Sequence, residues 1–250
     1  MNNKLALIVG VGYRNGVGGA LCASLLQSGV NVIAVGRSQE KLDSLSQDLA
    51  QLDCKGKFFT LVSDVSNEEK IEEIFEAVDD KDMLCDLLVY NAAEPNIPKN
   101  FLEMKPEYLR KMWHTNWLTA ALVSQQAISR MLPNNRGTLI YTGATASTRG
   151  NAGYSAFASS KSGLRTLSQS LAKEFGPKGI HVVHTIIDGI INGTRLAEYG
   201  DGIGQKLLNE RGLDGSLSTD AIASAYLYLY NQEMSTWTHE LDLRPFSEKF

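Results

Sequence analysis

The segment Gly153 to Gly163, GYSAFASSKSG, carries the side chains in this chain that are best suited to chemistry. Lys161 has an ammonium group, and Tyr154 lies seven residues before it, so the two side chains face one way on a helix. A phenol near an ammonium can transfer a proton. Phe157, four residues before Lys161, has a phenyl ring that neither gives nor takes a proton. Hydroxyls able to hold a carbonyl oxygen stand close by in the sequence, at Thr142, Thr145 and Ser147.

A glycine-rich stretch follows the first apolar run. Residues 5–9 lead directly into GVGYRNGVGG, residues 10–19. Glycines at this place let the backbone approach a pyrophosphate, and the next helix offers its free N–H groups to that pyrophosphate. The spacing leaves two registers open, because either Gly10 or Gly12 can be the first glycine of the motif. We expect a nucleotide site built from Gly10, Gly12, Arg14, Gly16, Val17 and Gly18.

The end of the second apolar run predicts which nucleotide binds. The run ends in Gly36-Arg37-Ser38. NAD sites place a carboxylate here against the ribose 2′-hydroxyl, whereas NADP sites use an arginine against the 2′-phosphate. Gly36 stands where the acid would stand, and Arg37 offers a planar fork of donors, with Arg14 as a second cation. We therefore expect NADP(H) to be the cofactor.

Apolar runs and helical patterns alternate along the whole chain. Strands separated by helices require right-handed crossovers, and they predict an α/β fold with a parallel sheet covered on both faces. Ser66, with an acid three residues later, indicates a capping box. The glycine-rich segment 189–215 is the one long irregular stretch and is expected to form a lid. Strands are expected at 5–9, 32–35, 58–62, 86–91, 137–142, 180–187 and 238–243, and helices at 17–27, 39–52, 66–78, 106–131, 153–175 and 221–230.

Composition limits the classes of protein that this chain can belong to. Its 250 residues are 43% hydrophobic and 21% charged, which suits one domain over 1–250 with one large core. The net charge of −4 without a block of like charges argues against nucleic acid and charged membranes as partners. The first apolar run is too short for a signal peptide or a membrane span, so we expect a cytoplasmic protein. No metal-ligand pattern occurs, and the three cysteines are expected to be free thiols, Cys22, Cys54 and Cys85.

Taken together, these motifs resemble the short-chain dehydrogenase/reductase family from residue 5 to about residue 190. The resemblance implies a single-domain Rossmann-type, doubly wound sheet in three layers. In the family a Tyr precedes the Lys by four residues and a Ser precedes that Tyr by thirteen; Phe157 and Ala144 stand there instead. The family's Lys binds the nicotinamide ribose and lowers the pKa of the Tyr, a role that falls to Lys161. Asn116 matches the Asn that holds a proton-relay water.

The same resemblance assigns further contacts to the cofactor. Asp64 and Val65 match residues that bind the adenine ring. The sequence 91–94, Asn-Ala-Ala-Glu, is similar to the family's Asn-Asn-Ala-Gly signature, with Glu94 in place of a glycine. The segment that follows Asp188 covers the nicotinamide carboxamide in the family. The resemblance therefore adds Asn91, Ala92, Ala93, Gly189 and Thr194 to the expected cofactor site.

Two branches of the family remain open. If Gly10 is the first glycine, two residues are inserted before Gly16, as in bacterial enoyl reductases. Those enzymes also use a Tyr separated from the Lys by six residues, which favours Tyr154 as the acid. Asn91 and Asn116, in contrast, are typical of the carbonyl-reductase branch.

The sequence therefore predicts an NADPH-dependent oxidoreductase with a non-standard active site, which transfers hydride to a carbonyl or enoyl substrate. Lys161, Tyr154 and Asn116 are its expected catalytic residues. The alternative is a cofactor-binding pseudoenzyme that senses NADPH or serves as an assembly partner, because removing a general acid slows catalysis about 10²–10⁴-fold. Family members usually pair through their long fourth and fifth helices, so a homodimer or homotetramer is expected.

Overall fold

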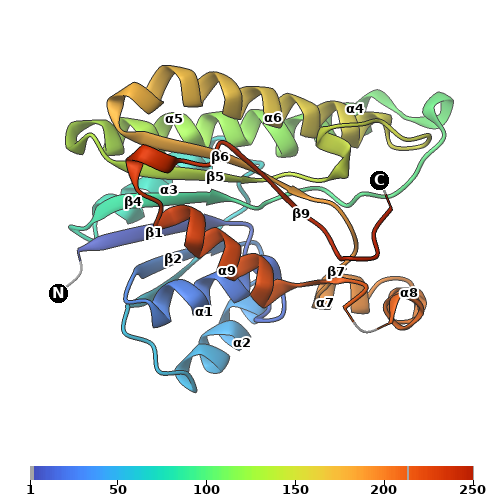
Figure 1. Ribbon diagram of the computed structural model, residues 1–250, viewed down its shortest axis with the longest axis horizontal. Coiled ribbons are helices and arrows are strands. Elements are labelled where there is room, and N and C mark those ends of the chain that lie inside the picture. The colour runs from blue at the N-terminus through green and yellow to red at the C-terminus, as the bar shows by residue number, and fades with distance from the viewer. Residues whose placement is uncertain (1–2, 213, 250) are drawn as a thin grey trace.

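A seven-stranded parallel sheet forms the centre of the part of the chain that the structure describes, residues 3–212 and 214–249 of a computed structural model (Figure 1). The strand order is β3-β2-β1-β4-β5-β6-β9. Met1, Asn2, Leu213 and Phe250, which belong to the expected domain 1–250, lie outside the described residues. The strands are β1 Lys4–Val9, β2 Asn31–Gly36, β3 Phe58–Val62, β4 Leu84–Tyr90, β5 Gly137–Thr142, β6 Ile180–Ile187 and β9 Glu240–Leu243.

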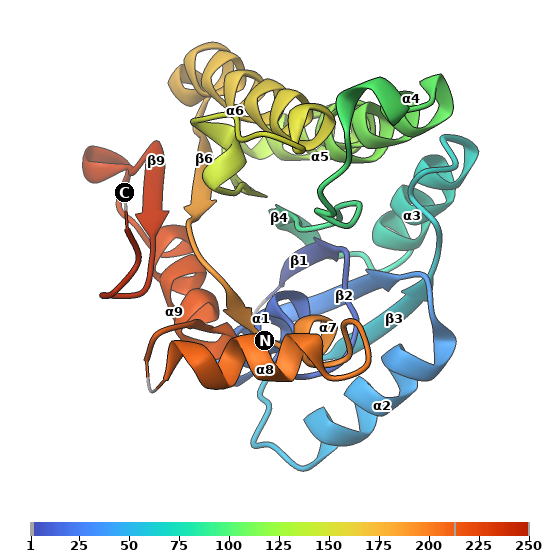
Figure 2. The same ribbon diagram turned by 90° about the vertical axis from the view of Figure 1, so that its right-hand side faces the viewer.

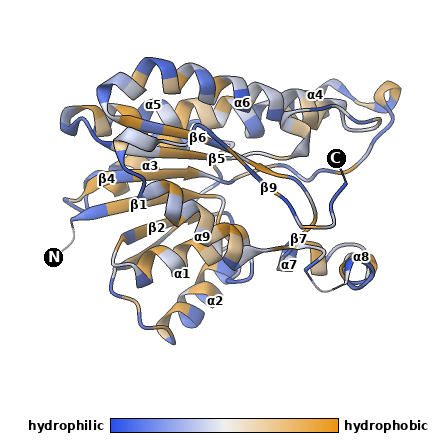
Figure 3. Cartoon of the chain, in the orientation of Figure 1, coloured by the Kyte–Doolittle hydropathy of each residue, from blue (hydrophilic) through white to orange (hydrophobic). Residues whose placement is uncertain are grey.

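Helices cover both faces of this sheet, as the alternating pattern predicts. One apolar layer joins the sheet to α1 (Val17–Gln27), α2 (Gln39–Ala50) and α9 (Thr219–Tyr230). A second layer joins the opposite face to α3 (Glu69–Asp79), α5 (Thr119–Met131) and α6 (Ser155–Phe175). Strands β2, β5 and β6 are buried along their whole length, as expected of strands covered by helices on both faces, and apolar residues lie near the middle of each (Figure 3). The doubly wound α/β fold is thereby confirmed.

The expected helix over 106–131 is helical throughout but not uniform. It consists of α4 (Pro106–Trp113), a π-helical turn (His114–Leu118) and α5. Such wide turns inside helices often mark functional positions, and Asn116 lies at the centre of this one.

The capping box expected at Ser66 was wrong. Helix α3 begins only at Glu69, and the hydroxyl of Ser66 donates instead to the carboxylate of Asp64. The Asp64 side chain also accepts the backbone N–H of Ser66, so this stretch forms a turn before the helix.

The segment 189–215, which we call the lid, is more regular than its glycine content suggested. It contains β7 (Ile191–Asn192), α7 (Thr194–Ala197) and α8 (Ile203–Arg211), and β8 (Leu217–Ser218) follows it. Strands β7 and β8 pair in parallel and join the two ends of the lid. Figures 1 and 2 place α7 and α8 together beyond one end of the sheet, on the side of α1.

A buried tyrosine fixes α9 to the ends of two central strands. The hydroxyl of Tyr226 lies 2.9 Å from Oγ1 of Thr142 on β5 and 2.5 Å from Oγ1 of Thr185 on β6. Burial, the dominant cause, raises the pKa of Tyr226 to about 12. The phenol therefore stays protonated at neutral pH and links α9 to β5 and β6 through these two hydrogen bonds.

We expect Tyr226→Phe to lower the free energy of unfolding by about 1–3 kcal/mol, because two buried threonine hydroxyls lose a partner. Urea unfolding monitored by circular dichroism measures this. Tyr228→Phe is the matched control, since Tyr228 is 66% exposed on the same helix. Equal stability of the Tyr226→Phe variant and the wild type would show that the hydrogen bonds of Tyr226 do not stabilise the fold.

Candidate active site

The glycine-rich loop meets the end of β4 at Gly10. Gly10 has a φ of +97°, and a Cβ atom there would lie 2.4 Å from the backbone nitrogen of Ala92. The side chain of Asn91 donates to the Gly10 carbonyl at 2.8 Å. A Cβ at Gly12 would meet only the Lys41 side chain, at 3.8 Å. The close approach at Gly10 therefore favours the register in which Gly10 is the first glycine and the loop is two residues longer.

The N-terminus of α1 is prepared for an anion. Its N-cap is Gly16, no side chain caps the helix, and no acidic residue lies in its first turn. The first N–H groups of a helix have no partner inside the helix, and the helix dipole places partial positive charge there. Val17 and Gly18 are buried against the loop, so the backbone rather than side chains faces this end. The residues present fit the pyrophosphate of a dinucleotide.

Arg37 is a free cation at the end of β2. Among residues 3–212 and 214–249, its side chain has no hydrogen bond or ion pair. Burial tends to raise the pKa of nearby Asp64, but hydrogen bonds from Ser66 and the charges of Arg37 and Lys111 outweigh this and lower it. A Cβ at Gly36 would lie 2.3 Å from the carbonyl oxygen of Val11. The packing of the glycine loop thus leaves no room for the carboxylate that an NAD site has here.

Arg14 is directed elsewhere. Its guanidinium forms a 2.9 Å ion pair with Asp220 in the first turn of α9. Its expected contact with the 2′-phosphate stays a prediction that this geometry does not support. Val65, which follows Asp64 and is expected at the adenine ring, has a buried side chain.

Lys161 is a buried ammonium at the end of β5. It is 3% exposed, and its Nζ donates to the carbonyl of Thr142 at 2.8 Å. Burial lowers the pKa of Lys161 to about 8, and the charge of Arg195 adds to the effect. Within the described residues Nζ makes no other hydrogen bond, so further N–H donors remain for ribose hydroxyls. Sequence reasoning missed Arg195, because only the fold brings α7 near Lys161.

The two positions that lack their hydroxyls form one apolar surface. Phe157 is buried with Met104, Met112 and Ala156, and Ala144 packs against this cluster. The Nζ of Lys161 lies 5.8 Å from the centre of the Phe157 ring. Phe157 and Ala144 thus complement each other as a packed pair next to the ammonium.

The hydroxyls named as substitutes are engaged in internal bonds. Thr142 bonds to Tyr226, and Ser147 accepts the N–H of Ala144. Thr145 donates to the carboxylate of Asp188, which is buried and lies 3.2 Å from Arg244 and 3.6 Å from Arg149. Asp188 is therefore a compensated charge, and the following Gly189 packs against Pro245.

Tyr154 stands at the entrance of α6. The helix begins at Ser155, two residues later than expected, so Tyr154 is the N-cap residue and is half-buried. Its carbonyl accepts the N–H of Ala158, which keeps its backbone in line with the helix that carries Lys161. Within the described residues its phenol has no hydrogen-bond partner.

Asn116 is fully buried and both polar atoms of its side chain are used. Its amide donates to Ser160 at 3.1 Å, and its oxygen accepts the backbone N–H of Glu94 at 3.2 Å. Glu94 is buried as well and pairs with Lys111 at 3.0 Å. The Asn116 side chain therefore joins α6 to the loop that contains Ala92 and Ala93.

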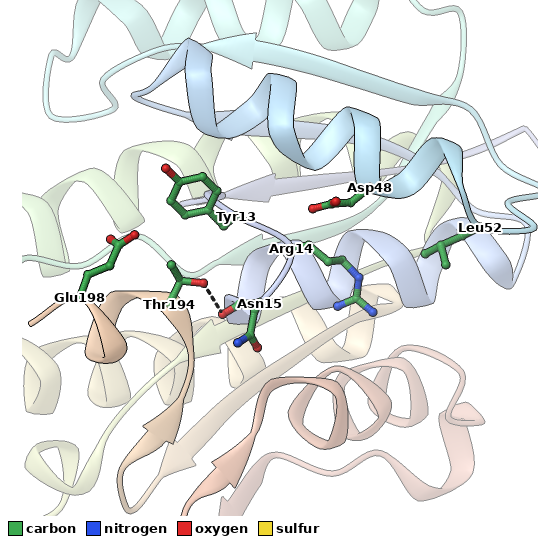
Figure 4. A pocket seen from close by; sticks show the side chains of 7 residues that line it. All are labelled: Tyr13, Arg14, Asn15, Asp48, Leu52, Thr194 and Glu198. Atoms are coloured by element: carbon green, nitrogen blue, oxygen red, sulfur yellow. Dashed lines mark hydrogen bonds between the residues drawn. The ribbon is translucent and has the colours of Figure 1, made fainter. Parts of the chain in front are cut away.

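Thr194 lies against the glycine-rich loop. Its backbone N–H and its hydroxyl both donate to the carbonyl oxygen of Asn15, at 2.9 and 3.3 Å (Figure 4). A pocket of about 490 Å³ opens beside this contact. Seven residues of the loop, α2 and the α7 region line it, namely Tyr13, Arg14, Asn15, Asp48, Leu52, Thr194 and Glu198.

In the described part of the chain, no group of three or more His, Cys, Asp or Glu residues is arranged to hold a metal ion. No helix there is long and apolar enough to span a bilayer.

Comparison with known proteins identifies relatives over most of the chain. The sequence family described as short chain dehydrogenase matches residues 4–201. Carbonyl reductase family member 4 of Danio rerio is 32% identical over 190 residues, 76% of each chain. The 3-oxoacyl-acyl-carrier-protein reductase FabG of Aquifex aeolicus is 27% identical over 244 residues, 96% of this chain and 95% of the relative.

Solved structures agree with the fold. A short-chain dehydrogenase from Rhodopseudomonas palustris superposes with a TM-score of 0.79 at 28% identity, covering 98% of this chain and 100% of that one. An alcohol dehydrogenase from Thermococcus sibiricus, complexed with 5-hydroxy-NADP, reaches a TM-score of 0.82 at 22% identity and covers 98% of each chain.

The buried charge of Lys161 lowers the free energy of unfolding at neutral pH. Each unit of pKa corresponds to about 1.4 kcal/mol, so the shift from 10.5 to about 8 means that holding charged Lys161 in the fold costs about 3–4 kcal/mol at pH 7. Between pH 8 and pH 10 the unfolded chain keeps this proton while the folded chain loses it, so stability gains from this group as pH rises.

We therefore expect Lys161→Met to be more stable than the wild type at pH 7, by about 2 kcal/mol, with the difference shrinking by pH 10. Urea unfolding of both proteins at several pH values measures the difference and cancels titrations that they share. A variant less stable than the wild type at pH 7 would contradict the prediction.

Proposed function

Because the chain belongs to the short-chain dehydrogenase family, we propose that it is an NADPH-dependent oxidoreductase that reduces a small carbonyl or enoyl substrate. The observation that carries the proposal is the buried ammonium of Lys161, which keeps free donors although its surroundings lower its pKa. A charge held at such expense in the core usually serves a site.

Each part of the cofactor has candidate partners. Arg37 would hold the 2′-phosphate, and Asp64 with Val65 the adenine. Lys161 would bind the nicotinamide ribose. When bound, the cofactor supplies the hydride. The other expected contacts are Gly10, Gly12, Gly16, Val17 and Gly18 at the pyrophosphate, Asn91, Ala92 and Ala93 along the cleft, and Gly189 with Thr194 at the carboxamide.

The residues around Lys161 favour a substrate that needs no strong acid. Phe157 and Ala144 offer no proton and no side-chain hydrogen bond to a carbonyl. Ketone reduction requires a proton on oxygen, whereas an enolate formed from an enoyl substrate can be protonated at carbon by water. Tyr154, the N-cap residue of the helix that carries Lys161, is the phenol that we propose as the proton donor. Asn116 acts as a positioning residue through Ser160 and Glu94.

A second function is supported by the engaged hydroxyls. Thr142, Thr145 and Ser147 all have internal partners, so the site lacks an obvious carbonyl-binding group. A protein that binds NADPH as a sensor or assembly partner needs none. In either case we propose a cytoplasmic homodimer or homotetramer that pairs through the helices 106–131 and 155–175, as the family resemblance implies.

Cofactor choice is the first test. NADPH should bind more tightly than NADH, and Arg37→Ala should remove most of the difference, because each charge-assisted contact contributes about 1.5–3 kcal/mol. Calorimetric titration measures both dissociation constants. Introducing an acid at Gly36 is a poor reciprocal test, because its Cβ would collide with Val11. Equal affinity of the wild type for both cofactors would contradict the proposal.

The source of the proton is the second test. We expect Tyr154→Phe to lower turnover of the best enoyl substrate at least about tenfold, with NADPH affinity nearly unchanged. The double variant Phe157→Tyr with Ala144→Ser should introduce or raise ketone reduction. Stopped-flow oxidation of NADPH with ketones, quinones and enoyl thioesters measures both. Tight NADPH binding without turnover of any of these would favour the sensor instead.

A further inference from the structure

The loop that carries the glycines is tied to both ends of the lid. The carbonyl of Asn15 accepts two hydrogen bonds from Thr194, the first residue of α7. The side-chain oxygen of Asn15 accepts a third, from the hydroxyl of Thr219 at 3.2 Å. Next to it, Arg14 pairs with Asp220 at 2.9 Å. These partners lie about 200 residues away in the sequence, at separations of 179 to 206.

The partners mark the two points where the lid leaves the body of the protein. Thr194 comes two residues after β7, and Thr219 comes directly after β8. Because β7 pairs with β8, the two ends of the lid lie side by side. One residue of the glycine-rich loop, Asn15, therefore contacts both of them at once.

The contact is closely packed. A Cβ at Gly193 would lie 2.9 Å from the carbonyl of Asn15 and 3.5 Å from the methyl group of Thr219. Thr219 is only 3% exposed, so its hydroxyl is largely shielded from water and depends on Asn15. The ion pair of Arg14 contributes less, because the side chain of Asp220 is 68% exposed. The hydrogen bond from Thr219 to Asn15 is thus the main side-chain link.

We propose that Asn15 is a positioning residue that clasps both ends of the lid to the cofactor loop before any ligand binds. This rests on the proposed function, since Thr194 is an expected cofactor contact. Ordering a loop during binding weakens affinity, so a lid that is already held leaves less to be ordered. Coupling of this kind is reciprocal, so bound NADPH should also reduce opening of the lid.

Thr219 provides a test outside the cofactor site. Thr219→Val keeps the methyl group near Gly193 and removes the hydroxyl, whereas Thr219→Ser keeps the hydroxyl and removes the methyl. We expect Thr219→Val to raise the NADPH dissociation constant about three- to tenfold, the range of one net hydrogen bond. It should also speed amide hydrogen exchange in α7 and α8 of the protein without cofactor. Thr219→Ser should resemble the wild type in both measurements.

Two further variants complete the experiment. Asn15→Ala should have the same effect as Thr219→Val, and the double variant should be no worse than either one, because both remove the same bond. Asp220→Asn is the control for the exposed ion pair and should change the dissociation constant less than about twofold.

The outcomes separate the two proposals. If the wild type does not bind NADPH, the proposed function fails, and hydrogen exchange in the lid still tests the clasp. If NADPH binds but Thr219→Val matches the wild type in affinity and in exchange, the clasp is overturned. Equal effects of Thr219→Ser and Thr219→Val would also overturn it, because packing of the methyl group, and not the hydrogen bond, would then hold the lid.

Discussion

The approach of β1 to β4 at Gly10 is the constraint on which the site depends. The backbone of Gly10 lies so close to Ala92 that no Cβ fits between them, and Asn91 fixes the contact with a hydrogen bond to the Gly10 carbonyl. This contact sets where the glycine-rich loop leaves the sheet. It also brings the N-terminus of α1, Arg37 and the loop after β4 to the same edge, where parallel strands place their ligands.

At the end of β5, the buried ammonium of Lys161 lies beside an apolar cluster. Lys161 is held by the carbonyl of Thr142, and Thr142 is itself fixed from the other face of the sheet by Tyr226. Phe157 and Ala144 form the neighbouring wall. The ammonium of Lys161 is therefore held in place beside side chains that cannot donate a proton.

The lid interacts with both the glycine-rich loop and the surroundings of Lys161. Its ends are joined by the pairing of β7 with β8 and held by Asn15, so the glycine-rich loop and α7 move together to the extent that these bonds persist. Arg195 on α7 lies within electrostatic reach of both Lys161 and Arg37. The position of α7 therefore affects the charge around both Lys161 and Arg37.

Local patterns in the sequence were sufficient for the strands of the central sheet, most helices and the motifs of the family, because apolar periodicity and glycine spacing act over a few residues. They gave the position of Lys161 and the absence of hydroxyls at Phe157 and Ala144 outright. The register of the glycine loop, the reason for Gly36 and the engagement of Thr142, Thr145 and Ser147 needed the tertiary structure. Each depends on atoms from distant segments, such as Ala92 against Gly10 or Asp188 against Thr145. The partner of Arg14 has the same cause, because only the fold brings Asp220 next to it. The capping box at Ser66 failed for a local reason, since the Ser66 hydroxyl bonds to Asp64 two residues before it.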